Sequence, residues 1–461
     1  MTFAKMLNMK SLKSILALFQ LDTNHDVPIT DITLDSRLVK PGTLFCAVKG
    51  HHFDGNAFIE NALKKGAAAV LCENPEQTNL DKNVFVIPNL YHQLGNIANF
   101  FYDEAASRLN LIGVTGTNGK TSITHYLAEL LYLIGENSAV IGTVGNGLWG
   151  KLETAERTTP DVFSLHKLLR QFVDQGAKWV AMEVSSHALT QNRVDGLKFY
   201  GAIFSNLTQD HLDYHKTMKA YGNAKAKLFE RPELKIAVLN HDDPFSETLV
   251  KRLPLKTRCE FYDATPIAKT KLLGQFNISN VNAAITLLAA SGFSLAELKM
   301  RAALLHPVKG RMETLRYPDT PLVVIDYAHT PDALIKAIQT LKEYAKPLWV
   351  VFGCGGDRDP SKRPLMATAV EQHADHIIVT EDNSRSESIE NIFTDIRTGF
   401  TNPDQMQFIP DRTEAIQFAL KHAKANDIIL LTGKGHETYM EKNGNKTHYD
   451  EREVVQKILA K

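Results

Sequence analysis

From residue 109 onward, short apolar runs rich in valine and isoleucine alternate with amphipathic stretches long enough to form helices. Buried parallel strands followed by crossover helices have this pattern. The expected strands are LNLIGV, SAVIGTV, WVAMEV, YGAIFSN, KIAVLN, VVIDYA, PLWVVFG, HIIVTED and DIILLTG. Nearly all of them end in a polar, glycine-rich or charged cluster, and open α/β sheets bind ligands at the carboxyl ends of their strands. The sequence therefore predicts an α/β fold with one or two active-site rims at those ends.

The chain has 461 residues, more than one hydrophobic core usually supports, so we expect three domains. Residues 1–102 have shorter apolar runs around the polar stretches TLDSR and GHHFDGN, which predicts a small, separate α/β domain. The stretch RMETLRYPDTP interrupts the strand–helix periodicity and indicates a second boundary. The expected domains are residues 1–102, 103–313 and 314–461, the central one built on a parallel sheet and the last one Rossmann-like.

The stretch LIGVTGTNGKTS joins an expected strand to an expected helix through a glycine-rich turn. Gly113, Gly116 and Gly119 allow backbone N–H groups to face a polyphosphate, and the N-terminus of the helix adds its positive dipole. Lys120 provides a positive charge for the outer phosphates, and Thr121 a hydroxyl for Mg²⁺. The spacing departs from the common GxxxxGK(S/T) loop, which indicates a particular subgroup of P-loop proteins. The alternative is a glycine-rich turn that binds no nucleotide.

Two further strand ends have groups suited to a divalent cation. MEVSSHAL places the carboxylate of Glu183 at one of them, and Mg²⁺ prefers few carboxylates together with phosphate oxygens and water. The other is followed by Asp210, His211, Asp213 and His215, of which His211 is the candidate ligand of a second cation. The alternatives are a helix cap at Glu183 and ordinary loop residues at the others. Because Mg²⁺ repels an ammonium, charge alone predicts that Lys225 contacts phosphate or points away.

Four strand ends in the last third of the chain have charged or polar groups. These groups are Asp326, Tyr327 and His329; Asp357, Arg358, Lys362 and Arg363; Asp382, Asn383 and Arg385; and Gly433 and Glu437. A zwitterionic amino acid needs a guanidinium for its carboxylate and a carboxylate for its ammonium. The alternative is a set of salt-bridged loops, but four clusters on consecutive strands favour a shared site.

The composition excludes some classes of partner. Lysine plus arginine, 52 residues, balance aspartate plus glutamate, 52 residues, so the chain as a whole has no net attraction to nucleic acid or to a membrane surface. No run is long enough to span a membrane. The four cysteines are far apart and show neither CxxC spacing nor a disulfide framework, which favours a reducing, cytoplasmic location.

With its motifs in this order, the chain resembles the Mur ligases over almost its whole length. The motifs are TLDSR, GVTGTNGKTS, ERTTPD, EVSSHAL with QNRVDG, SNLTQDHLDYH, YGNAKAKLF, GQFNISN, KGRME, DYAHTPDAL, GCGGDRDPSKRPLM, DNSRSE and GKGHE. The resemblance implies a UDP-substrate-binding N-terminal domain, a central P-loop ATPase domain and a C-terminal domain that binds an amino acid. It also implies an enzyme that adds the third residue of the peptidoglycan stem peptide to UDP-N-acetylmuramoyl-L-alanyl-D-glutamate. ATP would convert the free carboxylate to an acyl phosphate, which the incoming amine attacks.

The resemblance also assigns site residues. For ATP it implies Gly116, Thr117, Asn118, Gly119, Lys120, Thr121 and Ser122, with Asn277, Asn280, Arg311 and Asp326 near adenine and ribose. For the UDP-muramoyl acceptor it implies Leu34, Ser36, His51, His52 and Phe53 at the uridine end, and Thr158, Thr159, Ser185, Gln191 and Arg193 at the peptide end.

Lys225 matches the position that carries a carbamate in this family. Carbon dioxide would turn its ammonium into an anion, which removes the electrostatic objection to a magnesium ion nearby. The implied metal ligands are Thr121, Glu183, His211 and carbamylated Lys225, and the implied catalytic residues are Lys120, Lys225, Glu183 and His211. ATP, Mg²⁺ and carbon dioxide are thus the expected cofactors. We expect a monomer that inserts into no membrane and binds no nucleic acid.

The identity of the added amino acid depends on the stretch DNSR. Family members that use meso-diaminopimelate have Asp-Asn-Pro-Arg there, with the arginine holding the distal carboxylate, whereas enzymes that use lysine lack this arginine. The chain has Asp382, Asn383 and Arg385 but Ser384 in place of proline, which can loosen the loop without removing the charge. The sequence therefore predicts meso-diaminopimelate, with contacts also from Arg358, Gly433 and Glu437.

Three alternatives stay open on sequence alone. One is the same reaction with L-lysine. Another is a different ligase of the superfamily, such as folylpolyglutamate synthase, which lacks the uridine-binding domain, or the ligase that adds the terminal dipeptide, against which DNSR argues. The third is a nucleotide-driven switch or motor.

Overall fold

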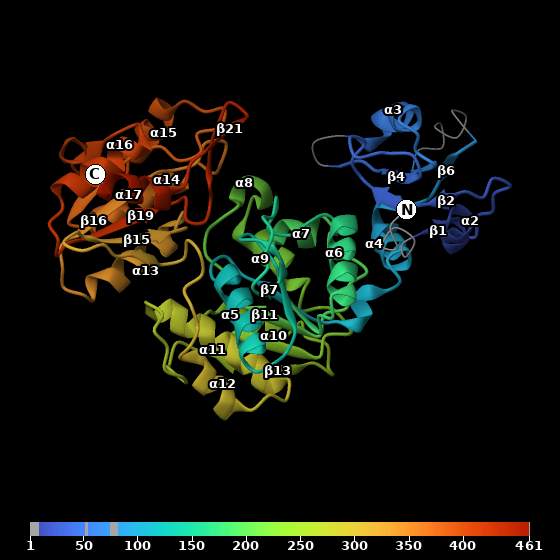
Figure 1. The fold of residues 1–461 in the computed structure, drawn as a ribbon, viewed down its shortest axis with the longest axis horizontal. Coiled ribbons are helices and arrows are strands. Elements are labelled where there is room, and N and C mark those ends of the chain that lie inside the picture. Colours follow the sequence, from blue (N-terminus) through green and yellow to red (C-terminus); the bar gives the residue numbers. More distant parts are fainter. Residues whose placement is uncertain (1–8, 51–53, 74–81, 461) are drawn as a thin grey trace. The chain divides into compact units, whose positions relative to one another are not determined.

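The structure is a computed structural model that describes residues 9–50, 54–73 and 82–460. The chain forms two compact units, one of Met1–Gly113, Glu136–Gly201 and Arg231–Lys235, the other of Val114–Gly135, Ala202–Glu230 and Ile236–Lys461. Both units contain parallel strands and helices, which confirms the predicted α/β class (Figure 1).

The first unit contains a parallel sheet near the N-terminus, in the order β3-β4-β5-β6. Its strands are β3 (Asp31–Thr33), β4 (Thr43–Ala47), β5 (Ala69–Cys72) and β6 (Val84–Val86). Side chains alternate along β4: Leu44 and Cys46 face one hydrophobic core, while Phe45 and Ala47 face another. The first core includes residues of α2 (Leu12–Leu16) and α4 (Leu90–Phe101), and the second includes residues of α3 (Ile59–Lys64). A short antiparallel pair, β1 (Lys10–Ser11) and β2 (Pro28–Ile29), adjoins α2.

The rest of the first unit supplies strands of a central sheet. Its elements are β8 (Ser138–Ile141), β9 (Asn146–Leu148), α6 (Val162–Asp174), β10 (Trp179–Glu183) and α7 (Ser186–Thr190). β10 runs parallel to β8, and β9 runs antiparallel to it. Helix α6 begins after Asp161, whose carboxylate accepts hydrogen bonds from the N–H groups of Phe163 and Ser164, as an N-cap should.

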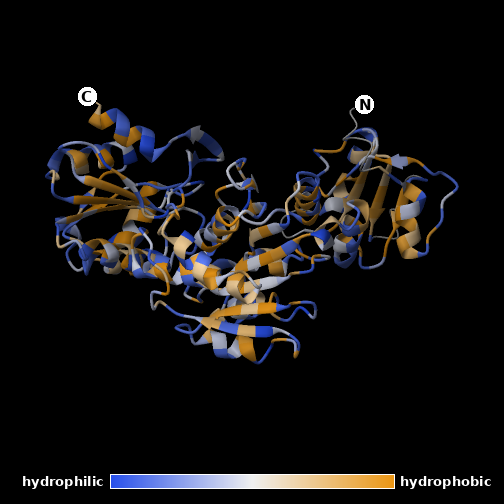
Figure 2. Ribbon diagram, turned by 60° about the horizontal axis from the view of Figure 1, so that its bottom comes forward, coloured by the Kyte–Doolittle hydropathy of each residue, from blue (hydrophilic) through white to orange (hydrophobic). Residues whose placement is uncertain are grey.

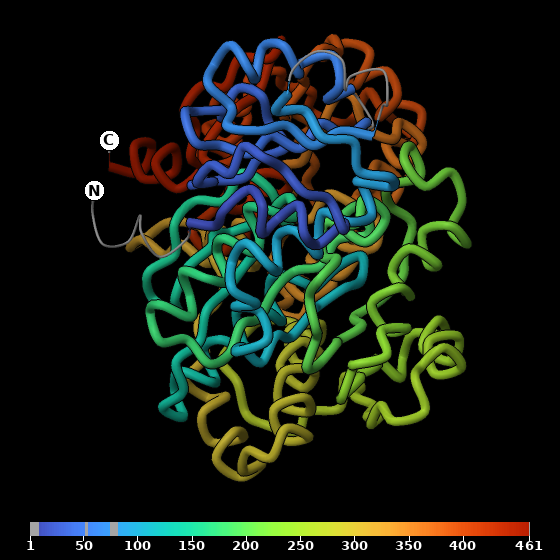
Figure 3. Tube along the Cα trace, turned by 90° about the vertical axis from the view of Figure 1, so that its right-hand side faces the viewer, coloured from blue at the N-terminus to red at the C-terminus, as the bar shows by residue number. Residues whose placement is uncertain are grey.

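The N-terminal half of the second unit holds the glycine-rich turn. Its elements are α5 (Lys120–Leu133), β11 (Gly201–Phe204), α8 (Leu212–His215), α9 (Met218–Ala226), β12 (Ile236–Asn240), α10 (Phe245–Val250), β13 (Arg258–Tyr262), α11 (Gln275–Ala290) and α12 (Leu295–Ala302). Helix α11 packs against α5 and α12, and α11 and α12 appear as the gold helices of Figure 3. With β7 (Asn110–Thr115), the central sheet has the order β13-β12-β11-β7-β10-β8-β9.

The C-terminal half of the second unit is built on a sheet in the order β14-β15-β19-β16-β17-β18. Its elements are β14 (Glu313–Leu315), β15 (Leu322–Asp326), α13 (Pro331–Lys342), β16 (Leu348–Phe352), α14 (Lys362–Glu371), β17 (His376–Val379), α15 (Ile389–Arg397), β18 (Gln407–Phe408), α16 (Arg412–His422), β19 (Ile428–Thr432), β20 (Tyr439–Lys442), β21 (Asn445–His448) and α17 (Glu451–Leu459). All strand pairs of this sheet are parallel except β14 with β15.

Helices cover both faces of this sheet, as the apolar runs predict. In β15, Val324 lies in a core with residues of α13, α14 and α15, while Val323 and Ile325 lie in a core with residues of α16 and α17. The strands are therefore apolar on both faces and appear as orange bands in Figure 2. The part of the chain that the structure describes contains no helix long and apolar enough to cross a membrane.

Every apolar run that the sequence analysis expected as a strand forms one. The antiparallel hairpin of β20 and β21, and the edge strands β9, β13, β14 and β18, were not expected. These strands are short, exposed or polar, so they lack the apolar runs on which the prediction depended.

Candidate active site

The glycine-rich turn after β7 leads into α5 as predicted. Gly119 precedes α5 at φ 87°, a conformation that favours glycine, and a Cβ there would lie 2.6 Å from Asn280 Oδ1. The end of β11, the strand next to β7 in the sheet, braces the turn: Thr117 N donates to Asn206 O at 2.8 Å, and Asn118 N donates to Asn206 Oδ1 at 2.9 Å. Ser205 Oγ donates to Asn118 O at 2.5 Å. The backbone of the turn is thus held in one shape, as a phosphate-binding loop requires.

Two lysine ammonium groups meet at this turn. Lys120 Nζ donates to Gly116 O at 3.0 Å and to Thr117 O at 2.8 Å. Lys225 Nζ, from α9, donates to the same Gly116 O at 2.7 Å and lies 4.3 Å from the centre of the Tyr221 ring. Burial, together with the nearby charge of Lys120, lowers the pKa of Lys225 well below its usual value. Lys225 therefore points into the loop, and of the two expectations from charge alone, pointing away is wrong.

Predicted adenine and ribose residues lie beside the loop. Arg311 Nη2 donates to Thr121 Oγ1 at 3.1 Å, and its guanidinium lies 4.3 Å from the centre of the Tyr327 ring. Asp326 accepts hydrogen bonds from the N–H groups of Met312 at 2.7 Å and Ala328 at 2.8 Å. Burial raises the pKa of Asp326, although Arg311 and these N–H groups oppose the change. The second unit thus brings Thr121, Arg311 and Asp326 into one connected group.

The other predicted nucleotide residues come from α5 and α11. Tyr126 OH donates to Asn277 Oδ1 at 3.0 Å, and Asn280 Nδ2 lies 3.5 Å from the same oxygen. Asn277, Asn280 and Ser122 are all buried. α11 thus presents its amides to the helix that begins at the phosphate loop.

The dense polar stretch after β11 lies in the same unit. His211 Nε2 is 3.4 Å from Asp210 Oδ2, and Lys362 Nζ is 3.8 Å from Asp210 Oδ1. Burial by itself would raise the pKa of Asp210, but His211 and Lys362 outweigh it, so the carboxyl has a lowered pKa and stays ionised. His215 is buried, and its pKa is lowered by burial and by the charge of Lys225.

The first unit gathers the residues predicted for the muramoyl-peptide end. Thr159 Oγ1 donates to Glu183 O at 2.8 Å, Ser185 N donates to Thr159 Oγ1 at 3.2 Å, and Arg193 Nη1 donates to Thr159 O at 3.0 Å. Arg193 Nε also donates to Gln191 Oε1 at 3.0 Å. Thr158 Oγ1 accepts a hydrogen bond from Thr143 Oγ1 at 3.0 Å.

The carboxylate of Glu183 turns toward β8. Its Oε1 accepts a hydrogen bond from Thr143 N at 2.7 Å, and the residue is 1% exposed. The helix-capping alternative for Glu183 is wrong, because Ser185 Oγ caps α7 by accepting from Ala188 N.

At the predicted uridine end, Leu34 packs against the core of the N-terminal sheet. The carbonyl of Ser36 accepts a hydrogen bond from Lys65 Nζ at 3.1 Å. His51, His52 and Phe53, which were also predicted there, lie outside the described residues.

The predicted amino-acid residues converge at the carboxyl ends of β17 and β19. Asn383 Nδ2 donates to Glu437 Oε2 at 2.8 Å, and Asp382 Oδ1 accepts from Asn383 N at 2.6 Å. Gly433, at φ 103°, lies against Asp382: a Cβ there would be 2.5 Å from Asp382 Oδ2. Burial by itself would raise the pKa of Asp382, but Lys434 and Arg412 outweigh it and lower the pKa. The carboxylate of Asp382 is therefore ionised where it borders this rim.

Arg385, the last residue of the stretch DNSR, is held by hydrogen bonds to neighbouring backbone carbonyls. Arg385 is at φ 51°; its Nη1 donates to Gly356 O at 2.7 Å, and its Nε is 3.4 Å from Glu441 Oε2. Ser384 is buried, and Arg358 is exposed. The loop is paired with β20, because Arg385 N donates to Glu441 O at 3.1 Å.

The predicted metal ligands divide between the two units. Thr121, His211 and Lys225 lie in the unit of the phosphate loop, and Glu183 lies in the other. Within the described ranges, no three His, Cys, Asp or Glu side chains form a group that could hold a metal ion. The donor chemistry fits magnesium only if Lys225 becomes an anion, because a hydroxyl, an imidazole and an ammonium do not make an oxygen-rich site.

Three residues that contribute to this site were not predicted from the sequence. Asn206 braces the phosphate loop, and its place at a strand end next to the polar stretch was a usable signal. Lys434 contacts both Asn383 and Glu437, and it stands inside the motif GKGHE. Asp332, in the first turn of α13, accepts a hydrogen bond from Asn118 Nδ2 at 3.2 Å, a contact across more than two hundred residues that no local pattern predicts.

Comparison with known proteins finds three family matches along the chain. Residues 28–102 match the Mur ligase family, catalytic domain; residues 114–265 match the Mur ligase middle domain; and residues 310–435 match the Mur ligase, glutamate ligase domain.

Similar proteins match the chain over nearly its whole length. A UDP-N-acetylmuramoyl-L-alanyl-D-glutamate--2,6-diaminopimelate ligase of Haemophilus influenzae is 42% identical over 97% of this chain and 100% of its own. The ligase of the same name from Pseudomonas putida is 44% identical over 95% of this chain and 96% of its own. A solved structure of a ligase with this name is 36% identical, with a TM-score of 0.69 over 98% of this chain and 99% of its own.

Proposed function

Since the chain belongs to the Mur ligase family, we propose that it is an ATP-dependent, ADP-forming ligase that joins meso-2,6-diaminopimelate to UDP-N-acetylmuramoyl-L-alanyl-D-glutamate in peptidoglycan synthesis. The observation that carries the proposal is the 42% to 44% identity, over almost the entire chain, to ligases whose name states this reaction. Arg385 at the rim of the amino-acid site adds a feature that the lysine-adding alternative does not need.

The proposed chemistry has two steps. The D-glutamate side-chain carboxylate attacks the γ-phosphorus of ATP, which forms an acyl phosphate and releases ADP. The amine of diaminopimelate then attacks the acyl carbon, and the tetrahedral intermediate expels phosphate and loses a proton to leave an amide. An acyl phosphate hydrolyses easily, so the site has to exclude water while it exists.

For the nucleotide, we assign the phosphates to the loop from Gly116 to Ser122. The N–H groups at the start of α5 and the ammonium of Lys120 would offset the phosphate charge. We assign Arg311, Asp326, Asn277 and Asn280 to ribose and adenine. The support is their position: Arg311 contacts Thr121 Oγ1, and Asn280 lies against Gly119.

For the acceptor, we assign Thr158, Thr159, Ser185, Gln191 and Arg193 to its muramoyl-peptide end, and Leu34 and Ser36 to its uridine end. The hydrogen bonds that join Thr159, Ser185 and Arg193 support a common site. We keep the boundaries 1–102, 103–313 and 314–461 as the proposed acceptor, nucleotide and amino-acid domains.

We propose that Lys225 is carbamylated and that Thr121, Glu183, His211 and the carbamate hold magnesium. When bound, magnesium would offset the negative charge of the phosphates and of the attacking carboxylate. Carbamylation needs an uncharged amine, and the burial that lowers the pKa of Lys225 favours that form. Carbamylation also replaces the ammonium of Lys225, which lies near that of Lys120, by an anion.

For the amino acid, we assign Arg385 to the distal carboxylate of diaminopimelate, with Arg358, Asp382, Asn383, Ser384, Gly433 and Glu437 around the rest of it. A guanidinium matches a carboxylate in a bidentate geometry, while lysine has no carboxylate at this end. We further propose a monomer in a reducing cytoplasm, in line with the buried free thiols of Cys46, Cys72 and Cys354.

The test is product formation by the purified chain with ATP, Mg²⁺ and the UDP-muramoyl-dipeptide, with diaminopimelate and L-lysine competing in one tube. We expect the diaminopimelate product by mass spectrometry, with one phosphate released per amide. In Arg385→Ala, we expect at least about tenfold loss of the preference for diaminopimelate over lysine, the size of one lost hydrogen bond to a charged group. Arg397→Ala is the matched control, since Arg397 is an exposed arginine stacked on Phe408.

Two outcomes would contradict the proposal. Phosphate release without acceptor or amino acid would indicate a nucleotide-driven switch rather than a ligase. An Arg385→Ala variant that keeps the full preference for diaminopimelate would defeat the assignment of the amino-acid site.

A further inference from the structure

We propose that Lys434 is a positioning residue of the amino-acid site, whose ammonium fixes the Asn383 amide and the Glu437 carboxylate in the orientation that receives the distal end of the substrate. This inference rests on the proposed ligase function and deepens it. Lys434 is thereby a residue that sets specificity without touching the reacting atoms.

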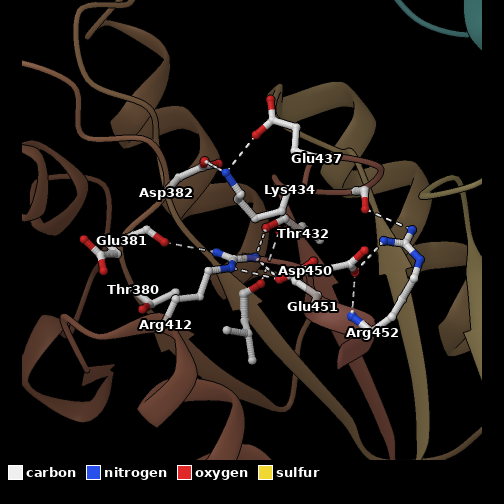
Figure 4. A network of polar contacts seen from close by, with 12 residues as sticks. Thr380, Glu381, Asp382, Arg412, Thr432, Lys434, Glu437, Asp450, Glu451 and Arg452 are labelled. Atoms are coloured by element: carbon white, nitrogen blue, oxygen red, sulfur yellow. Dashed lines mark hydrogen bonds and ion pairs between the residues drawn. The ribbon is translucent and has the colours of Figure 1, made fainter. Parts of the chain in front are cut away.

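Lys434 is placed between the groups it would orient. It directly follows β19 and Gly433, its side chain is 0% exposed, and it lies close to Asp382 and Glu437 in Figure 4. Its Nζ donates to Asn383 Oδ1 at 2.9 Å and to Glu437 Oε2 at 2.8 Å, and it is 3.7 Å from Asp382 Oδ1. A completely buried ammonium has to be paired, and here its partners are residues already assigned to the substrate.

The ammonium determines which way the Asn383 amide faces. A lysine has donors only, so the atom of the amide that faces Lys434 has to be the oxygen. The N–H of Glu441 also donates to Asn383 Oδ1, at 2.9 Å. With both donors on Oδ1, the amide nitrogen is directed to Glu437 Oε2, 2.8 Å away. The amide nitrogen has two N–H groups, so beside the one that Glu437 accepts it has a second that suits a substrate carboxylate.

Lys434 also sets the charge of this rim. Without it, the carboxylates of Asp382 and Glu437 would be two uncompensated negative charges near one buried amide. With it, part of this negative charge is offset and part is left for the substrate ammonium, while the Arg385 guanidinium, whose Nε lies 3.4 Å from Glu441 Oε2, offers a positive charge for the carboxylate. An amino acid with both groups at its distal end fits this pattern better than one with an ammonium alone.

The buried side chain of Arg412 holds the backbone next to Lys434 in place. Arg412 Nη2 donates to Thr432 O at 2.6 Å, and its Nη1 donates to Glu381 O at 3.2 Å (Figure 4). These carbonyls belong to the residues directly before Gly433 and Asp382. Arg412 in turn pairs with Glu451 at 2.7 Å, both side chains being 0% exposed. The two strand ends are therefore fixed relative to one another, so the position of Lys434 is defined.

The experiment compares Lys434→Met, which keeps an unbranched side chain of similar length but removes the charge, with the matched control Lys446→Met. Lys446 is exposed, and its Nζ lies 4.2 Å from the centre of the Tyr439 ring, which Lys434 Nζ approaches to 5.1 Å. In Lys434→Met, we expect KM for the amino acid to rise at least about tenfold, as for a lost hydrogen bond to a charged group. We expect KM for ATP and for the UDP-muramoyl acceptor to stay within about twofold, and the preference for diaminopimelate over lysine to fall. Lys446→Met should change none of these.

A merely structural lysine would behave differently. It would lower the thermal midpoint and the active fraction while leaving all three KM values and the preference unchanged, and that result would overturn the proposal. Lys434→Arg keeps the charge, so we expect it to restore part of the preference.

If Lys434→Met does not fold, the double variant Lys434→Met/Glu437→Gln removes the uncompensated carboxylate and is compared with Glu437→Gln alone. Our proposal expects a higher amino-acid KM in the double variant, and equal values would refute it. Measurements use whichever amino acid the wild type prefers. If the wild type makes no amide at all, the proposed function is refuted. If the wild type is active and Lys434→Met has the same KM values and the same preference, only this inference is refuted.

Discussion

The carbonyl of Gly116 accepts hydrogen bonds from two lysine ammonium groups, at 3.0 Å from Lys120 and 2.7 Å from Lys225. Two like charges at one acceptor repel each other, and the repulsion is strong where burial excludes water. The pKa of Lys225 is lowered, which favours the neutral form of its amine. A neutral, buried amine is the form that adds carbon dioxide, and the product carbamate would be attracted to Lys120.

We therefore expect the activity to depend on bicarbonate. Removal of dissolved carbon dioxide should lower the rate, and added bicarbonate should restore it. Lys225→Ala should lose roughly 10²- to 10³-fold in kcat, as when one electrostatic stabiliser is removed, and should not respond to bicarbonate. Lys219→Ala, which changes an exposed lysine of the same helix, is the control. Carbon-13 NMR with labelled bicarbonate should show a lysine carbamate; a fully active enzyme without that signal would exclude the modification.

Among the elements, β14 and α17 are joined by a charged pair close to the predicted boundary of the last domain. Arg452 Nη2 lies 2.5 Å from Glu313 Oε2, and Gly310 N donates to the same oxygen at 2.7 Å. Burial by itself would raise the pKa of Glu313, but these partners outweigh it and lower the pKa. A carboxylate with a lowered pKa in the folded state stabilises the fold above its unfolded-state pKa, and this contribution is lost as the pH falls through the folded value.

We expect Glu313→Gln to lower the free energy of unfolding by about 1–2 kcal/mol at neutral pH. The difference from wild type should shrink as the pH falls below the usual glutamate range, because the wild type then also loses the charge. Urea unfolding at a series of pH values measures this. Glu453→Gln, in an exposed pair with His448, is the control and should cost less than about 1 kcal/mol. A difference that is independent of pH would show that the charge of Glu313 does not matter.

Elements differ in how far the sequence determines them. The strands of the central and C-terminal sheets are buried on both faces, so each is a continuous apolar run that can be read directly. The β20–β21 hairpin is polar and exposed, and it was missed although Asn443 and Gly444 form an Asn-Gly turn with φ 50° and 75°. The site contacts of Lys434 and Arg412 depend on side chains from separate strand ends, which no local spacing encodes.

At the scale of the whole molecule, the two compact units divide the proposed ligand sites. The first unit contains Thr159, Ser185 and Arg193, assigned to the acceptor, and the second contains Lys120 and Arg311, assigned to the nucleotide. The hydrogen bonds described for each group stay within its own unit. We therefore expect the nucleotide and the acceptor each to stabilise the protein through the residues of its own proposed site.

A ligand that binds only the folded state stabilises it by about 2.7 kcal/mol at a concentration one hundred times its Kd. We therefore expect the thermal midpoint to rise with a non-hydrolysable ATP analogue plus Mg²⁺, and to rise independently with the UDP-muramoyl-dipeptide. Lys120→Ala should lose most of the first shift and keep the second, because the loss of one charge at the phosphates weakens only nucleotide binding. Arg193→Ala should do the reverse. If Lys120→Ala lost both shifts, nucleotide binding would be a precondition for acceptor binding; if it kept both, Lys120 would not bind phosphate, and the assignment of the loop would be wrong.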